Sequence, residues 1–178
     1  RMRNLKLDDA EFAKEIEVVK EERRLRTDDK PTGLTYEQLM AVAWRASPYQ
    51  NPVIGWMNDL DNMKLPDLQR WYEYWYAPNN ATLIVVGDVQ AQEVLELAKK
   101  HFGSIQPSKL GELKPMVEPR QRGLTRVTVR APAKQPYMAM GFKTPSVATA
   151  EADWEPYALS VLAAVLDGGN SSRLSSEL

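Results

Sequence analysis

The residues in this sequence that most suggest a chemical role are two acids, Glu15 and Glu22, which are seven positions apart. A helix is expected from Asp8 or Asp9 to about Arg26, and at about 100° per residue it places both carboxylates on one face. Residues seven apart lie two turns apart, or about 10 Å along the axis. The two acids project between two groups of apolar side chains: Phe12, Ile16 and Val19 on one side, Val18 and Leu25 on the other.

The surroundings of these carboxylates are informative, because a carboxylate among apolar groups is costly unless it is paired or bound to a cation. A cation or a basic partner at Glu15 and Glu22 would offset that cost. The alternative is a solvated acidic stripe of Glu11, Glu15 and Glu22 that pairs with arginines, and the helix pattern leaves both open. The opposite, solvated side is expected to carry Lys14, Glu17, Lys20, Glu21 and Arg24.

Composition excludes most other catalytic templates. The chain has no Cys and one His, so disulfides, thiol chemistry, zinc–cysteine sites and a His-x-x-x-His zinc site are ruled out for these residues. The single His101 ends an expected helix, where a cation complements the helix dipole. His101 is not expected to lie near any serine as its base, so a hydrolase triad is not expected.

Charge and hydropathy exclude two partner classes. Lys and Arg total 23 against 24 Asp and Glu, a formal net charge of -1, which provides no global positive field for a nucleic-acid backbone. No run approaches 18 consecutive apolar residues, so no membrane span is expected. The lack of cysteine is compatible with the bacterial periplasm or the cytoplasm.

Periodicity and breaking residues predict an α+β chain. Helices are expected at 8–26, 35–44, 66–76, 91–102 and 154–166. Strands are expected at 81–86, 125–130 and 136–142, and the apolar run Leu83 to Val86 is expected to be nearly fully buried. Prolines interrupt 104–123 and periodicity is lost there, so this segment is interpreted as a linker.

Two further motifs are interpreted as structural. Gly168-Gly169 follows a helix and lacks the Gly-Lys-Ser/Thr ending of a phosphate-binding loop. Trp71, Tyr72 and Trp75 share one face of an amphipathic helix, so they are expected in the core rather than stacked on bases or sugars.

Several runs, taken in order, resemble one known family. They are EIEVVKEE (15–22), SPYQNPVIG (47–55), DLQRWY (67–72) and YAPNNATLIVVGD (76–88). Together they resemble the pitrilysin (insulinase, M16) family of zinc metallopeptidases, and GGNSSRL (168–174) is similar to the glycine-rich segment of that family's following domain. The resemblance covers nearly the whole chain.

The resemblance implies a zinc site made of an inverted motif, His-x-x-Glu-His, on an upstream helix and a third ligand, a glutamate, on a later helix. Alignment matches that ligand to Glu22, and it matches Glu15 to an acid that helps organise the site. Zinc held in this way keeps a position open for water, lowers the pKa of that water and polarises the scissile carbonyl. The glutamate of the motif would be the general base. This chain contains no His-x-x-Glu-His, so it is expected to be inactive by itself.

The fold that the resemblance implies is α+β, M16-like (LuxS/MPP-like), with helices packed on a mainly antiparallel sheet. Residues 1–103 are expected to form the later part of one such domain, 104–123 the linker and 124–178 the opening of a second. We therefore interpret the chain as an internal fragment. Because neither domain would be complete in such a fragment, part of its apolar surface would be bare. We expect that surface to be covered by a complementary M16-like half or subunit, or by non-native self-association.

The function implied for the parent protein is that of a zinc-dependent metalloendopeptidase acting on peptides or unfolded polypeptides. One alternative is a non-catalytic M16-like scaffold, a half or subunit that binds substrate or partner, in which Glu22 is a relic. Another is an unrelated helical and β binding module, with Glu15 and Glu22 solvated and far from any cleft.

A first prediction concerns metal content. One glutamate without two imidazoles supplies too few strong donors for a zinc site, so a chain of these residues is expected to hold no stoichiometric zinc. Elemental analysis after dialysis measures this directly. One tightly held zinc per chain would contradict both the ligand assignment and the interpretation as a fragment.

Overall fold

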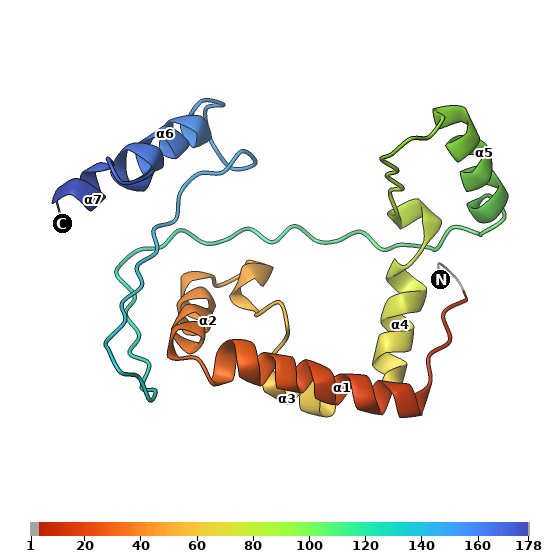
Figure 1. Cartoon of the computed structure of the whole chain (residues 1–178), viewed down its shortest axis with the longest axis horizontal. Helices are drawn as coiled ribbons and strands as arrows, with labels where there is room; N and C mark the ends of the chain where they lie inside the picture. The colour runs from red at the N-terminus through yellow and green to blue at the C-terminus, as the bar shows by residue number, and fades with distance from the viewer. Residues whose placement is uncertain (1–3, 178) are drawn as a thin grey trace. The chain divides into compact units, whose positions relative to one another are not determined.

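The protein is described here by a computed structural model that covers residues 4–177. The chain divides into two compact units, one that extends to Ala139 and one that begins at Met140. The first contains α1 (Asp9–Arg23), a π-helical turn (Arg24–Asp28), α2 (Pro31–Ala43), α3 (Met57–Asn62), α4 (Leu65–Trp75), α5 (Ala91–Phe102) and short 3₁₀ turns at Pro48–Gln50 and Pro78–Asn80. The second contains α6 (Glu155–Asp167) and α7 (Arg173–Glu177) (Figure 1).

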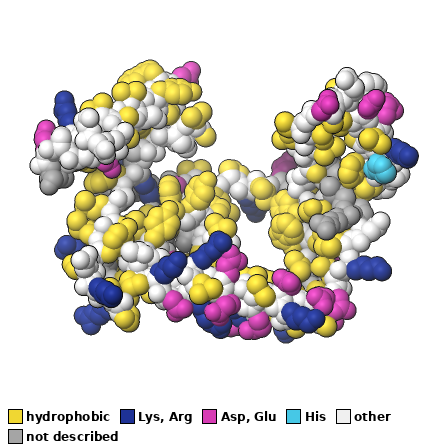
Figure 2. Space-filling view, in the orientation of Figure 1, with side chains coloured by type: hydrophobic (Ala, Val, Ile, Leu, Met, Phe, Trp, Pro, Cys, Tyr) yellow, Lys and Arg dark blue, Asp and Glu magenta, His cyan; other side chains and the backbone are white. Residues whose placement is uncertain are grey.

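Helix α1 begins where the sequence predicts, because Asp8 caps it. The Asp8 carboxylate accepts the backbone N–H groups of Ala10 at 2.9 Å and Glu11 at 3.2 Å, which satisfies two of the free donors of the first turn. The helix then widens into the π-helical turn, which ends at Asp28 and is followed by the cap residue Asp29. The predicted span of 8–26 is thus confirmed. Acidic and basic side chains gather over this helix (Figure 2).

Helix α2 begins four residues earlier than predicted. Pro31 occupies its first position, where the fixed φ of proline suits a helix and the missing N–H is not needed. Thr35, expected as the cap, lies inside the helix, and its hydroxyl donates to the carbonyl of Pro31 at 2.8 Å. The start was missed because proline interrupts a helix at most positions and is favourable only in its first turn.

Helices α4, α5 and α6 confirm the predicted spans to within one residue. Pro66 lies in the first turn of α4, and the Asp67 carboxylate accepts the N–H of Lys64 at 2.9 Å to close the turn. Of the described apolar residues, Leu60, Leu65 and Ala77 are buried. Trp71 is 57% exposed, so its expected place in the core is wrong. No helix within residues 4–177 has the length and apolar character that a membrane span requires.

The expected sheet is not present in the part of the chain that the structure describes, where no residue is assigned to a strand. Segments 81–86, 125–130 and 136–142 have no regular structure, and the predicted burial of the first is wrong: Leu83, Ile84, Val85 and Val86 are 59%, 78%, 45% and 92% exposed. A strand exists only if a neighbour pairs with its backbone N–H and C=O groups. The run is apolar and β-branched, but the described residues do not cover it.

A prediction follows from the contact between α2 and the π-helical turn. A Cβ on Gly33 would lie 2.8 Å from the backbone oxygen of Arg26. Helix propensity alone predicts that Gly33→Ala stabilises the protein by about 0.5–1 kcal/mol. Because that backbone oxygen cannot give way easily, we expect the opposite, a loss of about 1–3 kcal/mol in the free energy of unfolding.

Urea unfolding followed by circular dichroism measures this loss. Gly123→Ala is the matched control, since its Cβ would meet nothing within 4 Å, and a change within about 0.5 kcal/mol is expected. A stabilised Gly33→Ala protein would show that α2 does not close against the turn.

Candidate functional site

The last turn of α1 is fixed by a buried ion pair between Arg23 and Glu37 of α2. Arg23 Nη1 lies 2.8 Å from Glu37 Oε2 and Nη2 lies 3.1 Å from Oε1, a bidentate arrangement. Both side chains are almost fully buried. The hydrogen bonds to Glu37 raise the pKa of the Arg23 guanidinium above its ordinary value, so the guanidinium keeps its charge.

Arg23 also holds two further segments. Its Nη1 donates to the backbone oxygen of Gly55 at 2.9 Å, and its Nη2 lies 3.2 Å from Asp28 Oδ1 in the π-helical turn. Gly55 has φ +87°, a left-handed conformation that glycine adopts without steric penalty. One guanidinium therefore joins α1, the π-helical turn, α2 and the loop that precedes α3.

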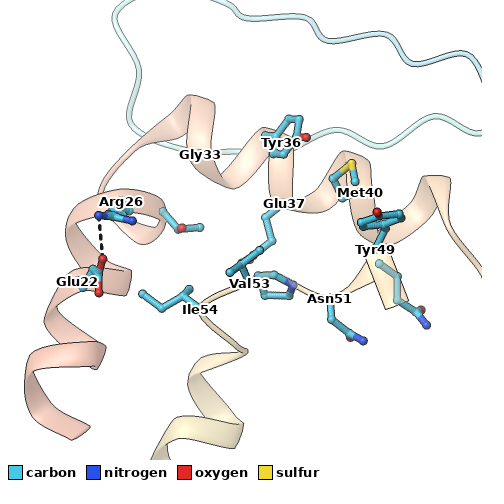
Figure 3. Close-up of a pocket in the computed structure, with 13 residues that line it drawn as sticks. Glu22, Arg26, Gly33, Tyr36, Glu37, Met40, Tyr49, Asn51, Val53 and Ile54 are labelled. Atoms are coloured by element: carbon cyan, nitrogen blue, oxygen red, sulfur yellow. Dashed lines mark ion pairs between the residues drawn. The ribbon is translucent and has the colours of Figure 1, made fainter. Parts of the chain in front are cut away.

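These four segments enclose a cavity of about 580 Å³. Its lining comes from the end of α1 and the π-helical turn (Glu22, Arg26, Thr27), from α2 (Gly33, Tyr36, Glu37, Met40) and from the loop before α3 (Tyr49, Gln50, Asn51, Pro52, Val53, Ile54). Figure 3 shows the side chains of Glu22 and Arg26 on one side of this space and those of Tyr49 and Asn51 on the other. The lining combines apolar and aromatic groups with a few polar ones, as is typical of ligand sites.

The structure places Glu22 at this cavity and Glu15 away from it. The Glu22 side chain is 43% exposed, and its Oε1 lies 2.9 Å from Arg26 Nη2, whose side chain is 74% exposed. Glu15 is exposed on the middle of α1 and does not line the cavity. Among the described residues, no three His, Cys, Asp or Glu side chains come together as a metal site.

The packed face of α1 differs from the one expected. Phe12, Ile16 and Val19 are half-buried as predicted, but the other apolar edge is open, with Val18 60% and Leu25 58% exposed. Lys20, expected in solvent, has a side chain only 14% exposed, with Nζ 2.8 Å from Glu17 Oε1 and 3.1 Å from Asp61 Oδ1.

Lys20 turns inward because α3, which the sequence did not reveal, packs against α1 and carries Asp61. The hydrogen bonds to Glu17 and Asp61 raise the pKa of Lys20 above its ordinary value. The face that joins α1 to its neighbours is therefore polar at Lys20 and Arg23.

Sequence reasoning missed Arg23 and Glu37. A signal existed, because Ile16, Val19 and Arg23 are spaced at i, i+3 and i+7 and so form one stripe of the helix. A cation in the last turn of a helix is also favoured by the helix dipole, which gives Arg23 a simpler explanation. A basic residue that continues an apolar stripe is a candidate for a buried ion pair.

Comparison with known proteins places this site in context. A family model described as "Peptidase M16 inactive domain" matches residues 62–178. The zinc protease PqqE of Helicobacter pylori is 38% identical in an alignment of 180 positions. That alignment covers 99% of this chain and 40% of that protein. A protein of Mycobacterium leprae named as an uncharacterized zinc protease is 32% identical over 97% of this chain and 38% of its own length.

One solved structure agrees in fold as well as in sequence. The crystal structure of a protease from Helicobacter pylori matches with a TM-score of 0.60 and 42% identity, over 67% of this chain and 29% of that one. The chain spans about two fifths of the length of the curated relatives described above. These matches leave no room for the alternative of an unrelated binding module.

The buried pair generates the prediction for this site. Glu37→Gln keeps the shape of the side chain but leaves the Arg23 charge buried without its main counter-charge, so we expect the free energy of unfolding to fall by about 3 kcal/mol. Glu21→Gln is the matched control, because Glu21 pairs with Arg24 at 3.0 Å on the surface, and its loss should stay within about 0.5 kcal/mol. Urea unfolding at neutral pH compares the two. Equal losses would mean that the Arg23 pair does not hold these segments together.

Proposed function

The chain belongs to the peptidase M16 family, and we propose that it is part of a zinc-dependent metalloendopeptidase that hydrolyses peptides or unfolded polypeptides. The names of the two relatives, both zinc proteases, support this proposal. In the longer protein, residues 1–103 would form the later part of one domain, 104–123 a linker and 124–178 the opening of the next. Peptide would bind to that protein, whose two domains or a complementary subunit would together enclose it.

The observation that carries the proposal is the place of Glu22 at the edge of the cavity. A zinc ligand must be ionised and reachable. Glu22 is reachable, because its carboxylate is half-exposed and its basic partner, Arg26, is a surface side chain rather than a buried one. The Glu22 carboxylate can supply one of the three protein ligands of the zinc. The family resemblance assigns the other two, which are imidazoles, to an upstream helix.

The residues of this chain have distinct roles in the proposed mechanism. When bound, zinc would supply an activated water and polarise the scissile carbonyl. Glu22 would hold one coordination position from the last turn of α1. The Arg23–Glu37 pair would fix the direction of that turn, since it ties α1 to α2. Glu15, two turns earlier, would help to organise the ligands, as the resemblance implies.

The proposed sheet explains the bare apolar segments. Three segments, 81–86, 125–130 and 136–142, are rich in β-branched and apolar residues. In the described chain they form no helix or strand, and most of their residues are exposed. Such segments become strands when a neighbouring strand supplies backbone partners. We propose that they join a mainly antiparallel sheet in the longer protein, on which the helices of each domain pack.

A non-catalytic scaffold is the second candidate. Residues 62–178 match a family model described as an inactive domain, which favours a substrate-binding or partner-binding role for that part of the chain. In that case Glu22 and Arg26 would be a surface ion pair without a metal. The two candidates differ in one observable, a His-x-x-Glu-His motif upstream of Glu22 in the longer protein.

The experiment compares three glutamates of α1 in the full-length protein. Glu22→Gln should lower the bound zinc from about one per chain to a small fraction and reduce kcat/KM for an unfolded polypeptide substrate by more than 100-fold, since even partners of metal ligands contribute 10- to 100-fold to affinity or activity. Glu15→Gln should show the smaller loss, about 10- to 100-fold.

Glu21→Gln is the control, because this surface residue lies beside Glu22 in sequence and also pairs with an arginine. It should keep full zinc content and activity. Full zinc content in the Glu22→Gln protein would refute the ligand assignment, and a full-length protein without metal-dependent hydrolysis would support the scaffold.

A further inference from the structure

The segment 104–123 was predicted to be a linker. Hydrogen bonds attach it at two separate points to earlier residues of the first unit. The side-chain amide of Asn79 donates to the carbonyl of Ser108 at 3.0 Å, and its oxygen accepts the Ser108 N–H at 3.0 Å. The hydroxyl of Tyr74 accepts the N–H of Gly111. These contacts hold the start of the segment to the end of α4. In Figure 1 the segment runs as an extended chain from α5 toward α2.

The second point of attachment is the carboxylate of Glu118. Three consecutive backbone N–H groups beyond the end of α2 donate to it. Arg45 donates at 3.0 Å to Oε1 and 3.2 Å to Oε2, and Ala46 and Ser47 each donate at 2.9 Å to Oε2. Successive N–H groups that converge in this way form an anion-binding concavity. A carboxylate beside the C-terminal end of a helix is opposed by the helix dipole, so these direct, charge-assisted bonds are what keep it there.

The backbone that Glu118 holds leads directly into the wall of the cavity. Ser47 caps the 3₁₀ turn Pro48–Gln50 through its side chain and its carbonyl. That turn presents Tyr49, which lines the cavity and whose ring lies 6.0 Å from the ring of Trp44. At the far end of the loop, Asn51 Oδ1 accepts the indole N–H of Trp56 at 3.1 Å. The loop is thus fixed by Trp56 on one side and by Glu118 on the other.

We infer that Glu118 is a positioning residue for the cavity beside Glu22, through which the segment 104–123 sets the place of the loop 45–53. The carboxylate makes no contact with the cavity itself. It acts through the backbone of Arg45, Ala46 and Ser47, and Asn79 anchors the segment ten residues before it. An extended chain of ten residues reaches about 33–36 Å, so the segment can join the end of α4 to the end of α2. The link to substrate rests on the proposed peptidase function, whereas the link to the loop does not.

The test measures the loop and the substrate separately in the full-length protein. In Glu118→Ala, hydrogen–deuterium exchange followed by mass spectrometry should show faster exchange, by about tenfold or more, in peptides that cover 45–47 and also in those that cover 49–53. KM for an unfolded polypeptide substrate should rise about three- to tenfold, while kcat stays within twofold. Glu118→Gln keeps the shape of the side chain and one acceptor oxygen but loses the charge and the second acceptor, so it should lie between wild type and Glu118→Ala.

Glu112→Ala is the matched control, since Glu112 is an exposed acid in the same segment, and its exchange and kinetics should equal those of the wild type. Unchanged exchange at 45–47 in Glu118→Ala would overturn the contact, and unchanged exchange at 49–53 would overturn its effect on the loop. Faster exchange at both places with an unchanged KM would overturn the link to substrate. If the wild-type protein hydrolyses no polypeptide, the proposed function fails, and the positioning role is decided by the exchange data alone.

Discussion

A single buried guanidinium, that of Arg23, determines how the first part of this chain is arranged. Its donors reach Glu37 in α2, Asp28 in the π-helical turn and the carbonyl of Gly55. A buried charge tolerates little displacement of its partners, because an unpaired charge in the interior costs several kcal/mol. The apolar core of the described residues is small, so this polar junction, more than hydrophobic contact, sets the relative positions of these segments.

The cavity is a consequence of that junction. Its walls are the same segments that Arg23 joins, and the loop that forms one wall is held at its ends by Glu118 and Trp56. None of these contacts depends on the cavity being filled. Walls that are held by contacts of their own need little further ordering when a ligand binds.

Features with a local cause could be predicted from the sequence, and features that need a distant partner could not. The cap at Asp8, the span of α5 and the start of α4 near Pro66 follow from rules that act within one turn. The segment 81–86 was recognised as apolar and β-branched, but strand formation depends on a neighbour that the described residues do not supply. The resemblance to the M16 family was confirmed by the comparisons, because several short motifs in a fixed order carry more information than any one of them.

The candidate site was predictable only in part for the same reason. Helical periodicity placed Glu15 and Glu22 on one face of α1. It could not tell which neighbouring face is packed, since that depends on α3 and its Asp61. Arg23 looked like an ordinary cation in the last turn of α1 and proved to be the centre of the junction. The segment 104–123 contains no helix or strand, yet its Glu118 is bound by backbone groups more than 70 residues away in sequence.

Two ion pairs with opposite properties meet at the end of α1. Glu22 and Arg23 are adjacent, and the helix turns their side chains about 100° apart, so one faces the cavity and solvent while the other faces the interior. The exposed Glu22–Arg26 pair is of the class worth about 0.3–0.5 kcal/mol, whereas breaking a buried pair such as Arg23–Glu37 costs about 3–5 kcal/mol. The first can therefore exchange its arginine for a stronger cation without disturbing the second. A half-exposed carboxylate on a helix end that a buried pair holds in place suits the zinc-ligand role proposed for Glu22.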